Sequence, residues 1–419
     1  MRASRAAALA ALVLAAGTVL PSAATASAAE GPQVGVDSTW FPVSNYRILD
    51  TRVGNGAPSG KVGPDGVVKL DIRKILGLTS GATPTAVVMN VTAVGATDES
   101  FVTAYPDGGA LPTVSNLNVS PAHQVTTNRV TVQVGTDGFV DLYNHVGNVH
   151  LVVDLQGFYT AKGANGYPGA TFTLGTPARL LDTRTEVGGH PGKLTGGEDG
   201  VFQMDVSSVA PGGGDLVVQA TVTEPTQSAH LTMYPALQAP WRTSDVNFDA
   251  GQTVTNLSYV YAGRDGLALY TNSGATHVVI DYIGQFQNHG LSGDAGTHGL
   301  FVPANPTRVL DTRKGLGAPQ AKPGPGSTTR VKVTGLNGVP EGVAAVVINL
   351  TGTNADQDGH ITALKAGDPV PGTSNLNYAA RQDTAAMTIV PVSADGFIEL
   401  YNPHGTVDLV ADVQGYYTN

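Results

Sequence analysis

The chain has 419 residues and a formal net charge of −10, so it has no long-range electrostatic attraction for nucleic acid or anionic membranes. It has no cysteine, which excludes disulfides, thiol nucleophiles and thiolate metal sites. Its 53 glycines, 26 prolines and charged content of only 13% favour many short strands joined by tight turns.

The first 28 residues are typical of an export signal. Arg2 and Arg5 form a basic start, residues 6–20 form an apolar run, and the ASA sequence at 26–28 offers a cleavage site. A membrane anchor is the weaker alternative, because a spanning helix needs roughly 20 apolar residues. We therefore predict a secreted, extracellular protein without a membrane span, which could associate with the cell surface.

Three stretches with the pattern R-x-L-D-T-R each open one copy of a long internal repeat. Their aspartates, Asp50, Asp182 and Asp311, are 132 and 129 residues apart. Such a period, close to the usual size of a domain, indicates successive similar domains. We predict a signal peptide at 1–28 and three repeats joined by glycine-rich linkers, with the repeats at 41–160, 172–287 and 300–419.

The first repeat contains eight short runs rich in Val, Thr, Ile and Tyr, which predict strands. Only 72–78 has the pattern of a helical turn. Eight short strands in a domain of this size are typical of a β-sandwich, in particular a jelly roll, with a small closed barrel as the main alternative. The three repeats could surround a pseudo-threefold axis or form a beaded string. The predicted strands are 46–52, 67–73, 86–94, 101–105, 116–119, 128–134, 139–144 and 149–159.

Comparison of the three copies shows which polar positions recur. Between the first and last strands, the copies share an amide-bearing residue in the third strand, a later polar cluster, and an Asp-Gly pair that favours a hairpin turn. In copy order these are Asn90, Gln219 and Asn349; residues 115–118, 244–247 and 374–377; and residues 137–138, 265–266 and 395–396.

The last strand of each copy is strongly apolar but contains an aspartate. A carboxylate in such a strand is expected to be buried and to need a partner. The two arginines of R-x-L-D-T-R are basic residues that recur in all copies. We therefore predict structural Arg–Asp ion pairs that join the first strand to the last. The residues are Arg47, Asp50, Arg52 and Asp154; Arg179, Asp182, Arg184 and Asp281; and Arg308, Asp311, Arg313 and Asp412.

Functional alternatives remain for the same residues. The recurring polar side chains could line a groove for sugar hydroxyls, or Asp50 and Asp154 could form the acid/base pair of a glycan hydrolase. His150 and His277, with Asp408 at the third position, could be half of a metal site, and acids near the Asp-Gly turns could bind calcium. None of these has the spacing of a dedicated motif, so no catalytic residue, cofactor or metal is predicted.

Trp241 is the clearest difference between the copies. It lies in a loop where the other copies have Pro112 and Pro371. An aromatic ring on a loop can stack on a sugar or anchor a protein partner, although it could equally pack beneath its own loop. We predict Trp241 as the candidate binding residue.

The motifs R-x-L-D-T-R, N-V-T, S-N-L-N, D-G-x-x-x-L-Y-N and D-x-Q-G-[FY]-Y resemble a repeat of proteins exported by high-GC Gram-positive (actinobacterial) bacteria, where it occurs alone or beside cell-wall and glycan-active modules. The second copy departs from this pattern at Thr271 and Ile283. The resemblance implies an extracellular or envelope-associated role. We predict a non-enzymatic binding or structural protein associated with the cell envelope or a glycan. The alternatives are a secreted glycan hydrolase and a protein-binding adhesin or inhibitor.

Overall fold

The computed structural model describes residues 35–78, 83–164, 168–289 and 295–419. The predicted signal peptide therefore lies outside the described residues. Residues from 35 onward belong to one compact unit. Within the part of the chain that the structure describes, no helix has both the length and the apolar character needed to cross a bilayer.

The chain is nearly all antiparallel β-structure, as predicted. All eight strands predicted in the first repeat are present, and the helical turn expected near 72 is α1, Ile72–Ile75, whose first turn is capped by Asp71. The strands of the first repeat are β1 Ser38–Asp50, β2 Gly66–Asp71, β3 Ala86–Val94, β4 Ser100–Pro106, β5 Leu117–Val119, β6 Val125–Gln133, β7 Phe139–Asn144 and β8 His150–Ala161.

The second and third repeats reproduce this series. The second repeat adds a two-residue strand, β10, and a short 3₁₀ turn, η1. Its elements are β9 Ala170–Asp182, β10 Leu194–Thr195, η1 Glu198–Gly200, β11 Phe202–Met204, β12 Gly214–Thr223, β13 Ala229–Pro235, β14 Val246–Phe248, β15 Val254–Ala262, β16 Leu267–Thr271 and β17 Ala275–Asn288. Those of the third are β18 Phe301–Asp311, β19 Ser327–Lys332, β20 Ala345–Thr353, β21 Gly359–Lys365, β22 Leu376–Tyr378, β23 Thr384–Pro391, β24 Phe397–Asn402 and β25 Asp408–Tyr417.

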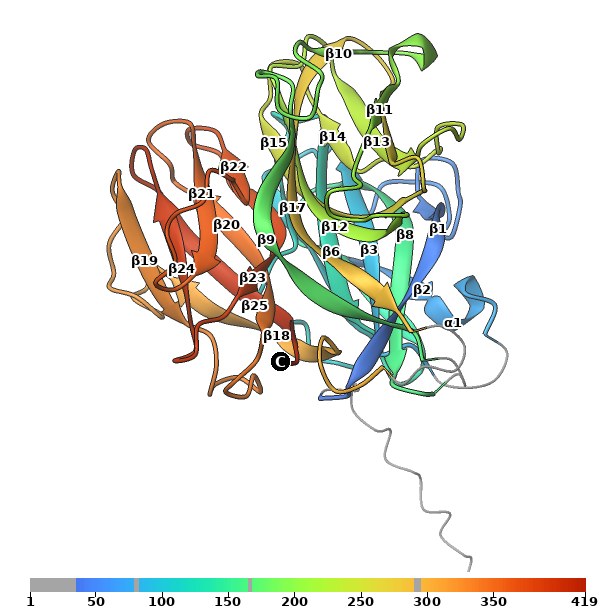
Figure 1. Cartoon of the computed structure of the whole chain (residues 1–419). Helices are drawn as coiled ribbons and strands as arrows, with labels where there is room; N and C mark the ends of the chain where they lie inside the picture. Colours follow the sequence, from blue (N-terminus) through green and yellow to red (C-terminus); the bar gives the residue numbers. More distant parts are fainter. Residues whose placement is uncertain (1–34, 79–82, 165–167, 290–294) are drawn as a thin grey trace, which may run out of the picture. The chain divides into compact units, whose positions relative to one another are not determined.

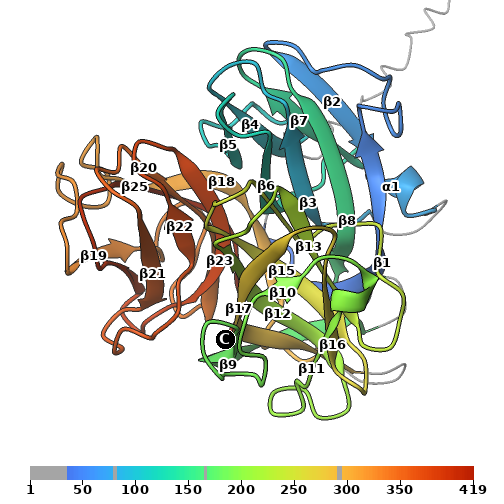
Figure 2. The ribbon, with the colours of Figure 1, turned by 90° about the horizontal axis from the view of Figure 1, so that it is seen from above.

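Each repeat is a two-sheet sandwich with jelly-roll strand order. In the first repeat one sheet has the order β1-β8-β3-β6 and the other has the order β2-β7-β4-β5. This arrangement of eight strands is that of the double-sheet jelly roll. The other two repeats have the same order, and the three groups of strands are seen in blue to cyan, green to yellow and orange to red in Figures 1 and 2.

Each sandwich has its own hydrophobic core, and a fourth cluster contains residues of all three repeats. The sheets that contain the first and last strands face this shared cluster and are joined through β1, which pairs with β9 at Trp40 and with β18 at Ser38. The repeats therefore pack together rather than forming a beaded string. That each repeat is a domain able to fold alone stays a prediction.

Six aromatic rings of the shared cluster pack in three pairs, and each pair joins two different repeats. In each repeat an aromatic residue of the first strand packs on an aromatic residue in the last strand of a neighbouring repeat. The ring centroids are 5.0 Å apart for Trp40 and Phe286, 4.5 Å for Phe172 and Tyr417, and 4.4 Å for Phe301 and Tyr159. The same contact made three times in a closed cycle gives the pseudo-threefold arrangement.

The glycine that follows the last-strand aspartate is required by these rings. A Cβ atom on Gly157 would lie 2.1 Å from the Trp40 ring, and one on Gly415 would lie 2.5 Å from the Phe301 ring. Gly284 is crowded by Phe172 in the same way. The D-x-x-G motif therefore reflects a ring packed directly on the backbone.

Candidate functional site

The first arginine of each R-x-L-D-T-R stretch makes a bidentate pair with the last-strand aspartate. Arg47 Nε and Nη2 donate to the two carboxylate oxygens of Asp154 at 2.9 and 3.1 Å, and the two residues lie opposite each other on β1 and β8. Asp154 is only 2% exposed. The equivalent contacts are 2.9 and 3.2 Å for Arg179 with Asp281, and 2.9 and 3.1 Å for Arg308 with Asp412.

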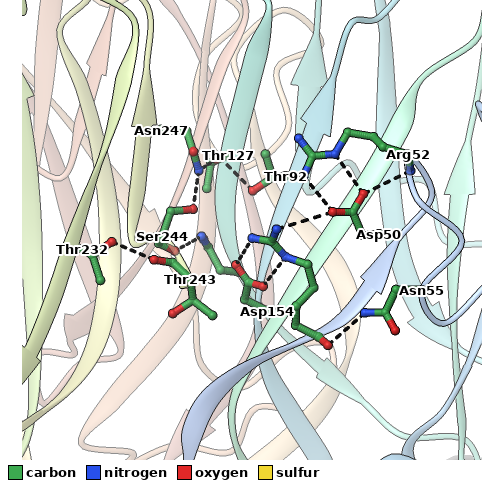
Figure 3. Close-up of polar contacts among 12 residues, drawn as sticks. Asp50, Arg52, Asn55, Thr92, Thr127, Asp154, Thr232, Thr243, Ser244 and Asn247 are labelled. Atoms are coloured by element: carbon green, nitrogen blue, oxygen red, sulfur yellow. Dashed lines mark hydrogen bonds and ion pairs between the residues drawn. The ribbon is translucent and has the colours of Figure 1, made fainter. Parts of the chain in front are cut away.

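The second arginine binds the aspartate within its own stretch. Arg52 donates from Nε and Nη2 to Asp50 at 2.9 and 2.7 Å, and its backbone N–H donates to the same carboxylate (Figure 3). Arg47 Nη1 also donates to Asp50, at 3.4 Å, so the two ion pairs form one network. The other repeats pair Arg184 with Asp182 and Arg313 with Asp311 in the same way.

This network favours a structural use of the carboxylates over an acid/base use. The hydrogen bond from Arg52 is the largest of the effects that lower the pKa of Asp50. A general acid of a glycan hydrolase needs the opposite, a pKa raised toward neutrality. Both oxygens of Asp154 already accept hydrogen bonds from Arg47. Arg52 thus lowers the pKa of Asp50, and Arg47 occupies both carboxylate oxygens of Asp154.

The recurring amide of the third strand forms contacts between repeats. Asn90 Nδ2 donates to the carbonyl oxygen of Ser244 at 2.6 Å, which links the first repeat to the second. Gln219 donates to the carbonyl of Asn375 at 3.3 Å, and Asn349 donates to that of Ser115 at 2.6 Å. The polar cluster of each repeat therefore accepts a hydrogen bond from the amide of the preceding repeat, and the three links close a ring.

Figure 3 shows the contact between the first and second repeats beside the arginine network of the first. Asn247 donates from Nδ2 to Thr127 in the first repeat and to Ser244 in its own, both at 2.8 Å. Asp50 at the end of β1, Arg52 in the turn that follows it and Asp154 on β8 are seen in the same view. The motifs that recur in the sequence thus meet at the boundary between repeats.

Arg129 was not predicted as a site residue, although it is completely buried in the shared part of the molecule. Its Nε donates to the carbonyl of Leu257 at 2.8 Å, and its Nη2 lies 3.3 Å from Asp245 in the second repeat. Burial lowers the pKa of Arg129 to about 10 and raises that of Asp245. The strand registers place Leu257 and Met387 at the equivalent positions. Comparing the copies at this position could have shown that only the first repeat has a charged residue there.

Among the described residues, no group of three or more His, Asp and Glu side chains is arranged to hold a metal ion. The residues considered as metal ligands, His150, His277 and Asp408, instead contact the threonine of R-x-L-D-T-R in their own repeat. His150 Nδ1 lies 3.1 Å from the Thr51 hydroxyl, and His277 lies 2.9 Å from that of Thr183. In the third repeat the hydroxyl of Thr312 donates to Asp408 at 3.1 Å.

Trp241 lies half-buried where the second repeat meets the first. Its ring centroid is 6.5 Å from that of Tyr234, and it lines a small cavity together with Pro42 and Asn45 of the first repeat. The Trp241 loop therefore lies against both its own sandwich and that of the first repeat. The binding role of Trp241 stays a prediction.

Two polar cavities adjoin each other at His123; loops of all three repeats line one, and loops of the first and third repeats line the other. His123 connects these loops, because its Nδ1 lies 3.3 Å from Asp249 and its Nε2 lies 2.9 Å from Gln382. These three residues line a cavity of about 670 Å³. His123 and Gln382 also line a second cavity of about 630 Å³. In the second cavity the Phe101 and His145 rings stack with their centroids 4.6 Å apart.

Comparison with known proteins gives no relative from which a role can be transferred. The sequence matches no known family profile and no curated protein. Two solved structures overlap most of the chain at 9% identity. One is described as the triple jelly roll fold and turret assembly in an archaeal virus (91% of this chain, 90% of that one, TM-score 0.17). The other is the atomic structure of Sulfolobus Turreted Icosahedral Virus (91% of each chain, TM-score 0.16). At these TM-scores the likeness carries no argument, and the jelly-roll assignment rests on the strand order.

Proposed function

We propose that this protein is an exported, non-enzymatic binding protein whose partner is a glycan of the cell envelope or the surroundings. The proposal of export rests on the N-terminal sequence pattern. The proposal of a non-enzymatic role is supported by the Arg–Asp networks, which engage the recurring carboxylates in all three repeats. These residues act as scaffold, and the binding function lies elsewhere.

The observation that carries the binding proposal is the pair of polar cavities around His123. Imidazole, carboxylate and carboxamide groups from three repeats converge there, from His123, Asp249 and Gln382. Such groups can exchange hydrogen bonds with several sugar hydroxyls. The stacked Phe101 and His145 rings add an aromatic surface next to them. Cavities of this size fall within the usual range for ligand sites, roughly 300–1,000 Å³.

The test is retention of the purified protein on insoluble peptidoglycan, chitin and cellulose. The wild-type protein is expected to be retained on at least one polymer. His123→Ala is expected to reduce the bound fraction at least fivefold, because it removes an imidazole that lines both cavities. Gln238→Ala, an exposed change outside both cavities, serves as the matched control. Melting curves of each variant show whether it is folded.

Trp241→Ala provides the second arm of this experiment. If Trp241→Ala abolishes retention and His123→Ala does not, the glycan site lies on the Trp241 loop, and the assignment to the cavities is wrong. If the wild-type protein is not retained on any of the three polymers, the glycan proposal itself fails.

A further inference from the structure

An apolar cavity of about 300 Å³ lies between the second and third repeats. Its wall on the second repeat contains Leu174, Pro177 and Ile283, and its wall on the third contains Val370, Pro371 and Ile389. Leu174 and Ile283 belong to the first and last strands of the second repeat, while Val370 and Pro371 belong to the loop after β21. The cavity is separate from the polar cavities around His123.

The same place between the first and second repeats holds only a small cavity. Because the repeats have the same strand registers, the positions of Pro42 and Gln156 correspond to those of Leu174 and Ile283. On the opposite wall, the loop residue Trp241 corresponds to Pro371 in the third repeat.

Two further aromatic residues distinguish the two places. Tyr259 and Tyr261 line the small cavity at positions where Ile389 and Pro391 line the large one. Three aromatic side chains at one boundary are thus replaced by two prolines and an isoleucine at the other. The cavity beside the smaller side chains is about 300 Å³, against about 20 Å³ beside the aromatic ones.

From this difference we infer that the cavity between the second and third repeats binds a small neutral aromatic molecule of one or two fused rings. The walls are mainly aliphatic side chains and prolines, which favour contact with a flat apolar ring. A closed apolar cavity of about 150 Å³ is enough to bind benzene, so about 300 Å³ accommodates a bicyclic ring. The chain's own Trp241 lines the equivalent place.

Indole is the probe, since it reproduces the ring of Trp241. Titration of the mature protein with indole, followed by calorimetry and by ligand-observed NMR, is expected to show one saturable site. Pro371→Trp introduces the residue found at the equivalent position of the second repeat and is expected to weaken indole binding at least tenfold. Pro112→Trp makes the same change in the first repeat and is the matched control, with unchanged affinity.

Val370→Trp is a second blocking variant. Val370 is 46% exposed on its loop, so the substitution does not disturb a packed core, and it is expected to weaken indole binding as Pro371→Trp does. The inference is overturned if the wild-type protein shows no saturable indole binding, or if both blocking variants, shown to be folded by their melting curves, bind indole as well as the wild type. Polymer retention involves other cavities, so the two proposals fail independently.

Discussion

At the scale of single residues, the molecule keeps several ionisable groups away from water, and Asp141 is one whose charge is poorly compensated. It lies on β7, is 4% exposed, and one of its carboxylate oxygens has no hydrogen-bond partner. Burial, and then the charge of Asp107, raise the pKa of Asp141 to about 6. The neighbouring Lys69 is engaged by Asp107, which it contacts at 2.7 and 2.8 Å. Asp141 therefore makes stability depend on pH.

Asp141→Asn should stabilise the protein at neutral pH and have little effect in acid. An unfolded aspartate has a pKa of ~3.9, below the value of about 6 in the fold, so the folded state binds the proton more tightly. The resulting stabilisation is complete below about pH 4 and is lost as the pH rises through about 6. Because asparagine stays neutral, the variant should gain up to about 3 kcal/mol in free energy of unfolding at pH 7.5.

Denaturant unfolding at pH 4 and pH 7.5 checks this difference. Asp199→Asn, at an exposed position, is the control and should change neither value. An equal effect of Asp141→Asn at both pH values would contradict the assignment of a proton to Asp141.

At the scale of elements, the pairing of the first strand with the last is the unit that the three repeats share. In the first repeat the register of β1 on β8 shifts on both sides of Arg47, between Pro42 and Tyr46 and between Arg47 and Leu49. The Arg47–Asp154 pair lies between these two irregularities. A bidentate pair fixes position as well as orientation, so we propose that it holds the register where the ladder is interrupted.

Asp154→Asn should lower the melting temperature markedly. The substitution removes the negative charge opposite Arg47, whose side chain is only 31% exposed, and leaves that cation poorly compensated. Breaking a buried pair from one side typically costs about 3–5 kcal/mol, and the partial exposure of Arg47 places the expected loss at the lower end. Asp281→Asn and Asp412→Asn should behave alike. Thermal unfolding followed by circular dichroism measures the change, and melting curves that match the wild type would contradict this role.

At the scale of the whole molecule, one buried charge pair breaks the pseudo-threefold symmetry. Arg129 and Asp245 come from different repeats, and both are at most 1% exposed. At the boundary between the third and first repeats, Met387 and Asn116 hold the corresponding positions and carry no charge. That boundary thus has neutral residues where the boundary between the first and second repeats buries a charge pair.

Introducing the same neutral residues at Arg129 and Asp245 should measure the energetic coupling between these two residues of different repeats. Arg129→Met alone leaves Asp245 without its charge partner and is expected to cost about 3–5 kcal/mol. The double variant Arg129→Met, Asp245→Asn removes both charges and should recover most of that loss, because a neutral replacement of a buried pair is often tolerated. The free energies of unfolding of the wild type, both single variants and the double variant form the test. Strictly additive losses would exclude the coupling.

The sequence by itself determined the strands and the recurring contacts within a repeat. Alternating β-branched residues and Asp-Gly turns act over a few residues, so the eight strands of the first repeat could be predicted from local pattern. An aspartate within the apolar last strand of each repeat indicated a buried partner, and Arg47 and Asp154 do meet. Repetition helped, because a chance pattern does not occur three times in the same order.

Only the tertiary structure decided how the repeats associate. The polar clusters around Ser115, Ser244 and Ser374 recur in the sequence, but pairing them with Asn349, Asn90 and Gln219 requires knowing which repeat follows which around the ring. The buried Arg129, the loops joined by His123 and the open cavity beside Pro371 likewise depend on side chains from different repeats. Contacts of this kind are set by packing in three dimensions, which local sequence pattern does not encode.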